Sequence, residues 1–177
     1  MKQILYKLSV IGWSLTTLIV LLSLIEINLV GKFPFLFILF AGFFIVTIPS
    51  IFYAKNNERI MEYEYDNNTK FGSGGIPLIP FFKNAPNWIL AIIFLSFISA
   101  VTFFSQSFNT EIGTVEIINS KYFLINHGKV IRELTENEYT KNKFSTIRAI
   151  FGLAMLFYSI PILVYKRLIE WENSVPK

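Results

Sequence analysis

The side chains best suited to chemistry in this sequence are its single histidine, His127, and three glutamates that follow it. The glutamates are Glu133, Glu136 and Glu138, and the cations that alternate with them are Arg132, Lys141 and Lys143. Mixed charges of this kind are typical of a solvated face. A metal site needs three or four ligands, and a general base needs a substrate cleft. Because His127 directly precedes Gly128, a turn residue is favoured over a catalyst.

The long apolar stretches offer hydroxyl groups but no Asp, Glu, Lys or Arg. A membrane-embedded hydrolase needs a nucleophile or a metal inside its spans, and a proton-coupled transporter needs a carboxylate there. Ser and Thr in spans mostly bond to carbonyls of their own helix or join two helices. The chain has no cysteine, which excludes thiolate zinc sites, cysteine nucleophiles and disulfides. We therefore expect no enzyme, no catalytic residue, no cofactor and no metal.

The apolar stretches themselves define the class of the protein. A helix needs about 20 predominantly apolar residues to cross the hydrocarbon core of a bilayer. Charged residues make up only 16% of the 177 residues, against about 25% in a typical soluble domain. We expect an all-α membrane protein with four transmembrane helices in two antiparallel pairs. The expected spans are 8–27, 33–54, 86–106 and 146–167.

The loops between the spans are too small for a soluble core, so one integral membrane domain is expected over 1–177. The first apolar run is too long for a cleaved signal peptide and is expected to remain as an anchor. Lys and Arg near span ends are more numerous on the side that would carry both termini. That side has Lys7, Lys55, Arg59, Lys83, Lys166 and Arg167, and the other has Lys32, Lys143 and Arg148.

These charges place both termini in the cytoplasm, with loop 55–85 cytoplasmic and loop 107–145 extracytoplasmic. The high content of Phe, Ile, Asn and Lys suggests an AT-rich bacterial genome, and hence a bacterial cytoplasmic membrane. The net charge of +4 is scattered at the ends of apolar runs and is not clustered on one soluble face. Lipid is therefore an expected partner and nucleic acid is not.

Loop 107–145 has the clearest local pattern outside the spans. Segments 113–118, 121–125 and 130–134 resemble strands, and His127-Gly128 fits a two-residue hairpin turn. An isolated hairpin is marginal in water, so a three-stranded sheet leaning on the membrane surface or on a partner is expected. Thr135 and Glu138 form a capping-box pattern, which predicts a helix that starts there and continues into the fourth span.

The segment 76–82 is apolar but too short to span a membrane, and Pro77 and Pro80 argue against a regular helix. Its prolines fit a P-x-x-P recognition strip, but an apolar segment at the lipid interface is favoured. Within the spans, small residues allow helix backbones to approach closely. The expected packing points are Gly42, Ser96, Ala100 and Gly152.

Two resemblances rest on the layout and on one string of residues. The string YFLINHGK over 122–129, followed by T-x-x-E-Y over 135–139 and FYS over 157–159, resembles a pattern in uncharacterised small bacterial membrane proteins. The layout of four spans with modest outer loops resembles inner-membrane immunity proteins against pore-forming toxins. Neither resemblance assigns a role to a residue.

The leading hypothesis is a non-catalytic membrane protein that binds another protein in or just outside the bilayer. An immunity or inhibitor protein is one concrete form of it. Tyr122, His127 and Arg132 of the hairpin are the expected partner-binding residues, on the premise that they are exposed and make no contact with the spans. An accessory or assembly subunit of a membrane complex, an oligomer, and a small channel or transporter lined by hydroxyls remain alternatives.

Overall fold

The computed structural model describes residues 1–66, 78–108 and 113–174 of the chain. The long helices are α1 (Lys2–Leu24), α3 (Ile38–Lys55), α6 (Asn87–Phe108) and α7 (Glu136–Asn173). The short helices are α2 (Leu29–Lys32), the 3-10 helix η1 (Pro34–Phe37), α4 (Glu58–Asp66) and α5 (Ile79–Phe82). The strands are β1 (Thr114–Ile118), β2 (Lys121–Asn126) and β3 (Lys129–Leu134). The mostly helical fold with a small sheet agrees with the expectation from sequence.

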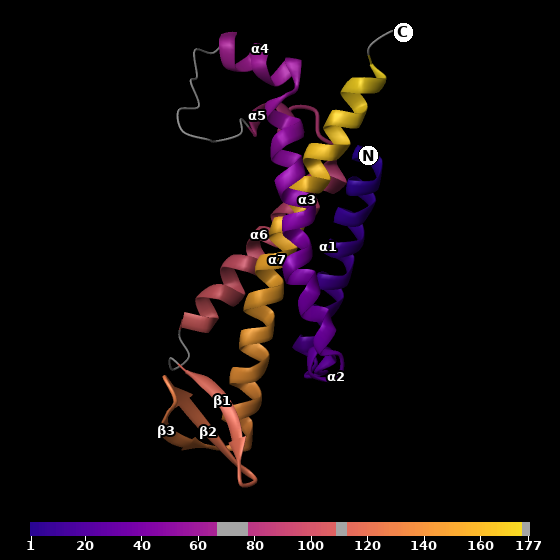
Figure 1. The fold of residues 1–177 in the computed structure, drawn as a ribbon. Helices are drawn as coiled ribbons and strands as arrows, with labels where there is room; N and C mark the ends of the chain where they lie inside the picture. The colour runs from indigo at the N-terminus through magenta and orange to yellow at the C-terminus, as the bar shows by residue number, and fades with distance from the viewer. Residues whose placement is uncertain (67–77, 109–112, 175–177) are drawn as a thin grey trace.

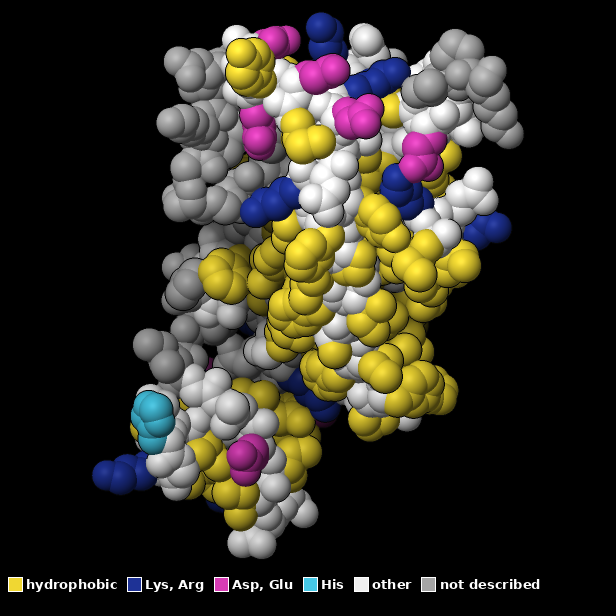
Figure 2. Space-filling view, turned by 45° about the horizontal axis from the view of Figure 1, so that its top comes forward, with side chains coloured by type: hydrophobic (Ala, Val, Ile, Leu, Met, Phe, Trp, Pro, Cys, Tyr) yellow, Lys and Arg dark blue, Asp and Glu magenta, His cyan; other side chains and the backbone are white. Residues whose placement is uncertain are grey.

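Four helices are long and apolar enough to cross a membrane, as the apolar stretches predict. Their bounds differ most from the expected spans in the first and the fourth helix. Helix α1 begins at Lys2, and the fourth span belongs to a helix of 38 residues that begins at Glu136. Figure 2 shows apolar side chains over the middle of the molecule and charged ones towards its ends. This distribution is compatible with a protein embedded in a membrane.

Helix α7 is the central element of the bundle, and α1, α3 and α6 all pack against it (Figure 1). In the apolar window of α7, 67% of residues are buried, compared with 33% in α1 and 17% each in α3 and α6. The contacts therefore do not divide the four helices into the two separate pairs expected from sequence, because α7 is shared. Both termini lie at the same end of the bundle (Figure 1).

The buried face of α1 consists largely of small and hydroxyl-bearing residues, which allow it to lie close to α7. Ser9 Oγ donates to the Leu5 carbonyl at 2.8 Å, and Thr16 Oγ1 donates to the Gly12 carbonyl at 2.9 Å. Buried hydroxyls in α3, α6 and α7 also donate to carbonyls of their own helix. Each of these hydroxyl groups thus has a hydrogen-bond partner within its own helix.

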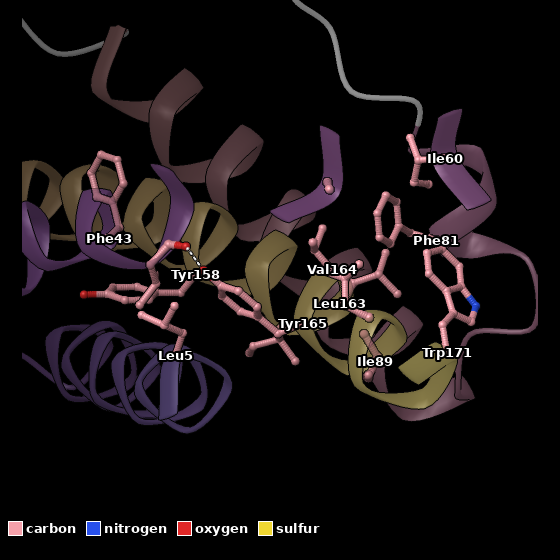
Figure 3. Close-up of a cluster of buried hydrophobic side chains, with 14 residues drawn as sticks. Leu5, Phe43, Ile60, Phe81, Ile89, Tyr158, Leu163, Val164, Tyr165 and Trp171 are labelled. Carbon is pink, nitrogen blue, oxygen red and sulfur yellow. Dashed lines mark hydrogen bonds between the residues drawn. The ribbon is translucent and has the colours of Figure 1, made fainter. Parts of the chain in front are cut away.

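Segment 79–82 corrects the expectation that its prolines exclude a regular helix. Residues Ile79–Phe82 form the one-turn helix α5, with Pro80 in its first turn, where a missing N–H costs no intrahelical bond. Phe81 is fully buried, and its ring lies 5.2 Å from that of Trp171 (Figure 3). The segment therefore closes one end of the core. Ile76 and Pro77, and with them the P-x-x-P pattern, lie outside the described residues.

The three strands form an antiparallel sheet in the order β1-β2-β3, as predicted. His127 and Gly128 have φ of 49° and 76°, so both turn residues take the left-handed conformation of a two-residue hairpin. The capping box of Thr135 and Glu138 is also confirmed, and the helix that it starts continues without interruption into the fourth span. The sheet lies against the first turns of α7, beyond the end of α6 (Figure 1).

Candidate functional site

The first turns of α7 hold the sheet through one of its two faces. The rings of Tyr122 on β2 and Tyr139 on α7 lie 4.7 Å apart. Arg132 on β3 forms an ion pair with Glu138, with Nη2 and Oε1 separated by 3.0 Å. Leu124, on the same face as Tyr122, is 1% exposed. The sheet is therefore fixed to the helix by an apolar contact, a ring pair and an ion pair.

Glu138 combines two roles at this junction. Its Oε2 accepts hydrogen bonds from the Thr135 backbone N–H at 2.8 Å and from Thr135 Oγ1 at 2.9 Å, while Oε1 faces Arg132. The hydrogen bond from Arg132, followed by those from Thr135, lowers the pKa of Glu138 from 4.5 to about 2. The carboxylate thus remains charged at neutral pH, caps the start of α7 and attaches β3 to that helix.

Two of the three residues expected to bind a partner face the protein itself. Tyr122 and Arg132 are half-buried, so the premise that they are exposed is wrong. Their contacts are with Tyr139 and Glu138 in the first turns of α7, before the expected fourth span at 146–167. His127 is exposed at the tip of the hairpin, as expected. The cause is strand alternation, which places Tyr122, Leu124 and Arg132 on one face of the sheet.

The opposite face of the sheet is open and partly apolar. The apolar residues that alternation places on this face are Ile118, Phe123, Ile125 and Val130. Val130 on the edge strand β3 is 53% exposed, and Ile118 is 38% exposed. Lys121 and Glu133 form an exposed ion pair at 3.1 Å on the same face. We call these four apolar residues the open face. The sequence analysis did not identify these residues. They could have been found from strand alternation, which places them on the face opposite Tyr122 and Leu124.

A cavity of about 440 Å³ lies between the sheet, the link that joins α1 to α3, and α7. Its polar lining comes from Asn28, Thr114, Asn142, Lys143 and Thr146, and its apolar lining includes Val30, Phe37, Leu124 and Ile147. Lys143 is its single cation, and its Nζ lies 5.3 Å from the centre of the Tyr139 ring. The cavity therefore places a polar lining next to an apolar one at the end of the bundle that carries the sheet.

The residues expected at helix contacts lie at several different interfaces. Ser96 and Ala100 are buried on α6, and Ser96 Oγ accepts a hydrogen bond from Trp13 Nε1 of α1 at 2.8 Å. A Cβ on Gly152 would lie 3.3 Å from Phe103 Cδ2, which places this glycine against α6. A Cβ on Gly42 would lie 2.6 Å from the hydroxyl oxygen of Tyr158.

Gly12 of α1 and Tyr158 of α7 make the tightest contact of this kind, and sequence reasoning missed both. A Cβ on Gly12 would lie 2.2 Å from Tyr158 Cε1. The Tyr158 hydroxyl donates to the Leu39 carbonyl at 2.8 Å, so its ring lies between α1 and α3. The available signal was the spacing of small residues in α1, since Gly12 shares the buried face with Ser9 and Thr16.

Within residues 1–66, 78–108 and 113–174, no group of three or more His, Cys, Asp or Glu side chains could hold a metal ion. The candidate site is a surface, formed by the open face of the sheet and the exposed edge of β3 beside it. Comparison of the chain with protein families, with curated proteins and with solved structures gave no match.

Proposed function

We propose that this chain is a non-catalytic integral membrane protein that binds another protein through the open face of its sheet. The observation that carries the proposal is that one face of the sheet is fixed to α7 while the other leaves apolar side chains exposed. A small sheet with an exposed apolar face and a free edge is a recurrent surface for binding an extended segment of a partner.

The attachment to α7 also favours binding energetically. Side chains held on a rigid element lose little conformational entropy when a partner binds, so more of the contact energy appears as affinity. Phe123 and Val130 supply the apolar centre of the surface, and the Lys121–Glu133 pair supplies a polar border. Interfaces commonly have this division into an apolar centre and a polar rim.

An inhibitor of a membrane-active toxin is one concrete form of this function, in line with the layout of four apolar helices. In this proposal the protein is located in a bacterial cytoplasmic membrane, with both termini in the cytoplasm and the sheet outside. An accessory subunit of a larger membrane complex would also bind protein. The identity of the bound partner, a toxin or a subunit of the complex, distinguishes the two functions.

The test is photo-crosslinking in cells with a photoreactive amino acid at Val130, compared with the same amino acid at Lys141, which is exposed on α7 away from the open face. We expect one protein adduct from position 130 and none from position 141. Phe123→Asp should remove the adduct without lowering the amount of membrane-inserted protein, because Phe123 does not face α7. Adducts with lipid alone, or an adduct unaffected by Phe123→Asp, would overturn the proposal.

A further inference from the structure

Two cavities of opposite character adjoin the short helix α5, at the end of the bundle remote from the sheet (Figure 1). The first, which we call the basic pocket, has a volume of about 280 Å³. It is lined by Arg59, Tyr63, Ile79, Pro80, Lys83, Asn84, Arg167 and Trp171. Three of these residues are cations and none is an Asp or Glu, so the lining is complementary to an anion.

The guanidinium groups of the basic pocket are close together and incompletely neutralised. Arg59 and Arg167 lie over the Trp171 ring, with their Cζ atoms 5.7 and 5.4 Å from its centre. Arg167 pairs with Glu170 and also donates to the Lys83 carbonyl, but its Nε is buried without a partner. Glu170 is shared with a further cation, Lys166, at 3.4 Å. Positive charge is therefore in excess at this point.

The acidic residues of the neighbouring helix α4 lie outside the lining of the pocket. Helix α4 carries Glu58, Glu62, Glu64 and Asp66, and none of them lines the pocket. Arg59, which belongs to the same helix, donates from Nη2 to the neutral Ser174 hydroxyl at 2.9 Å. An anion entering the pocket would meet Arg59, Lys83 and Arg167 without displacing a carboxylate from its lining.

The second cavity is an apolar groove of about 550 Å³. It is lined by Leu78 and Phe82 beside and on α5, by Leu90, Ile93, Phe94 and Phe97 on α6, and by Leu156 and Ile160 on α7. Leu78 and Phe82 are four residues apart and so lie on one side of the helical turn. Ile79 and Lys83, which line the basic pocket, are the next residues along the chain. The pocket and the groove are therefore lined by neighbouring residues of the same short segment, and the groove follows one face of α6 for about 10 Å into the bundle.

We propose that the basic pocket and the apolar groove together bind one anionic phospholipid. Its phosphate group lies among Arg59, Lys83 and Arg167, and one acyl chain lies along the faces of α6 and α7. Basic pockets beside membrane helices bind lipid head groups through charge and hydrogen bonds. A phosphate group bound there would lie at the level of the lipid head groups. Trp171 and the exposed Trp88 at the start of α6 are consistent with this position, because Trp side chains concentrate at the membrane interface.

The full chain in a neutral detergent provides the test, with phosphatidylglycerol and phosphatidylcholine of identical acyl chains as probes and native mass spectrometry as the measurement. The variant is Arg59→Gln with Lys83→Gln, since both side chains are exposed and their loss leaves the core intact. The matched control is Lys7→Gln with Lys55→Gln, two exposed cations near the same end that do not line the pocket. Inorganic phosphate in large excess is the competitor that distinguishes a lipid from a free phosphate ion.

We expect phosphatidylglycerol to bind more tightly than phosphatidylcholine. Its affinity should fall about fivefold for each cation removed, hence about 25-fold in the double variant, with the control within about twofold of wild type. Equal binding of the two lipids, an unaffected double variant, or full displacement by inorganic phosphate would overturn the proposal. The sheet lies at the opposite end of the bundle, so this failure would leave the protein-binding proposal untouched.

Discussion

The contact between Gly12 and Tyr158 provides the sharpest test of how the bundle is held together. In the variant Gly12→Ala, the new methyl group would lie 2.2, 2.5 and 2.6 Å from three atoms of the Tyr158 ring. Non-bonded carbon atoms normally approach to about 3.5–4.0 Å, so the ring and α1 must separate by more than 1 Å. The ring cannot retreat towards α3, because the Tyr158 hydroxyl already fills the space of a missing Cβ on Gly42.

The expected cost follows from these distances. Overpacking of this kind costs about 1–3 kcal/mol, and breaking the hydrogen bond from Tyr158 to the Leu39 carbonyl adds about 0.6 kcal/mol. Gly152→Ala is the matched control, because its methyl group would come no closer than 3.3 Å to any neighbour. Both variants gain about 1 kcal/mol in helix propensity. This gain cancels when the two variants are compared. We expect the free energy of unfolding of Gly12→Ala to be lower than that of Gly152→Ala by about 2 kcal/mol, which is the cost of the clash with the Tyr158 ring.

The free energies are obtained by titrating the protein with SDS in mixed micelles and following helix content by circular dichroism. In a Tyr158→Leu background, which removes the ring, Gly12→Ala should cost little. Two results would refute the reasoning. One is a Gly12→Ala variant as stable as Gly152→Ala, and the other is an equal cost of Gly12→Ala with and without the Tyr158 ring.

Three further predictions concern the sheet junction, α6 and the topology. The pKa of Glu138 in the folded protein, about 2, lies below its ordinary value of 4.5, so its contribution to the attachment of the sheet is complete above pH 4.5 and is lost as the pH falls towards 2. Protection of the sheet amides from hydrogen exchange should therefore fall over this pH range, and Glu138→Gln should make the protection independent of pH there. Ser96→Ala should lower the free energy of unfolding in SDS by about 0.6 kcal/mol through loss of the bond from Trp13, and no change would mean that this bond is not formed in the bilayer. Reporter domains inserted after Asn56 and after Asn126 should report opposite sides of the membrane, with the first cytoplasmic; the same side for both would contradict an odd number of spans between them.

Local patterns in the sequence were sufficient for the four long helices and the three strands of this fold. Charge-free apolar stretches predicted four helices because a bilayer selects for length and composition alone. The capping box predicted the start of α7, and Gly128 predicted the turn, because each depends on residues only a few positions apart. The same patterns left open which helix faces meet, and so the central place of α7 was missed.

The site depended on longer-range geometry. Tyr122 and Arg132 were expected to face outwards, but side chains alternate along a strand, so their direction depends on which face of the sheet packs on α7. That choice is made by Leu124 and Leu134 in contact with the rest of the fold. The burial of Phe81 was likewise not predicted, because it depends on contact with Trp171, far away in the chain.

The central position of α7 has a consequence for biogenesis. It follows α1, α3 and α6 in the chain, yet all three pack on it. Its 38 residues take about 2–8 s to synthesise at 5–20 residues per second. Over that interval the three earlier helices have been inserted without the neighbour that covers most of their buried faces. A chain that ends before Glu136 would therefore leave the buried faces of α1, α3 and α6 without the helix that packs on all three.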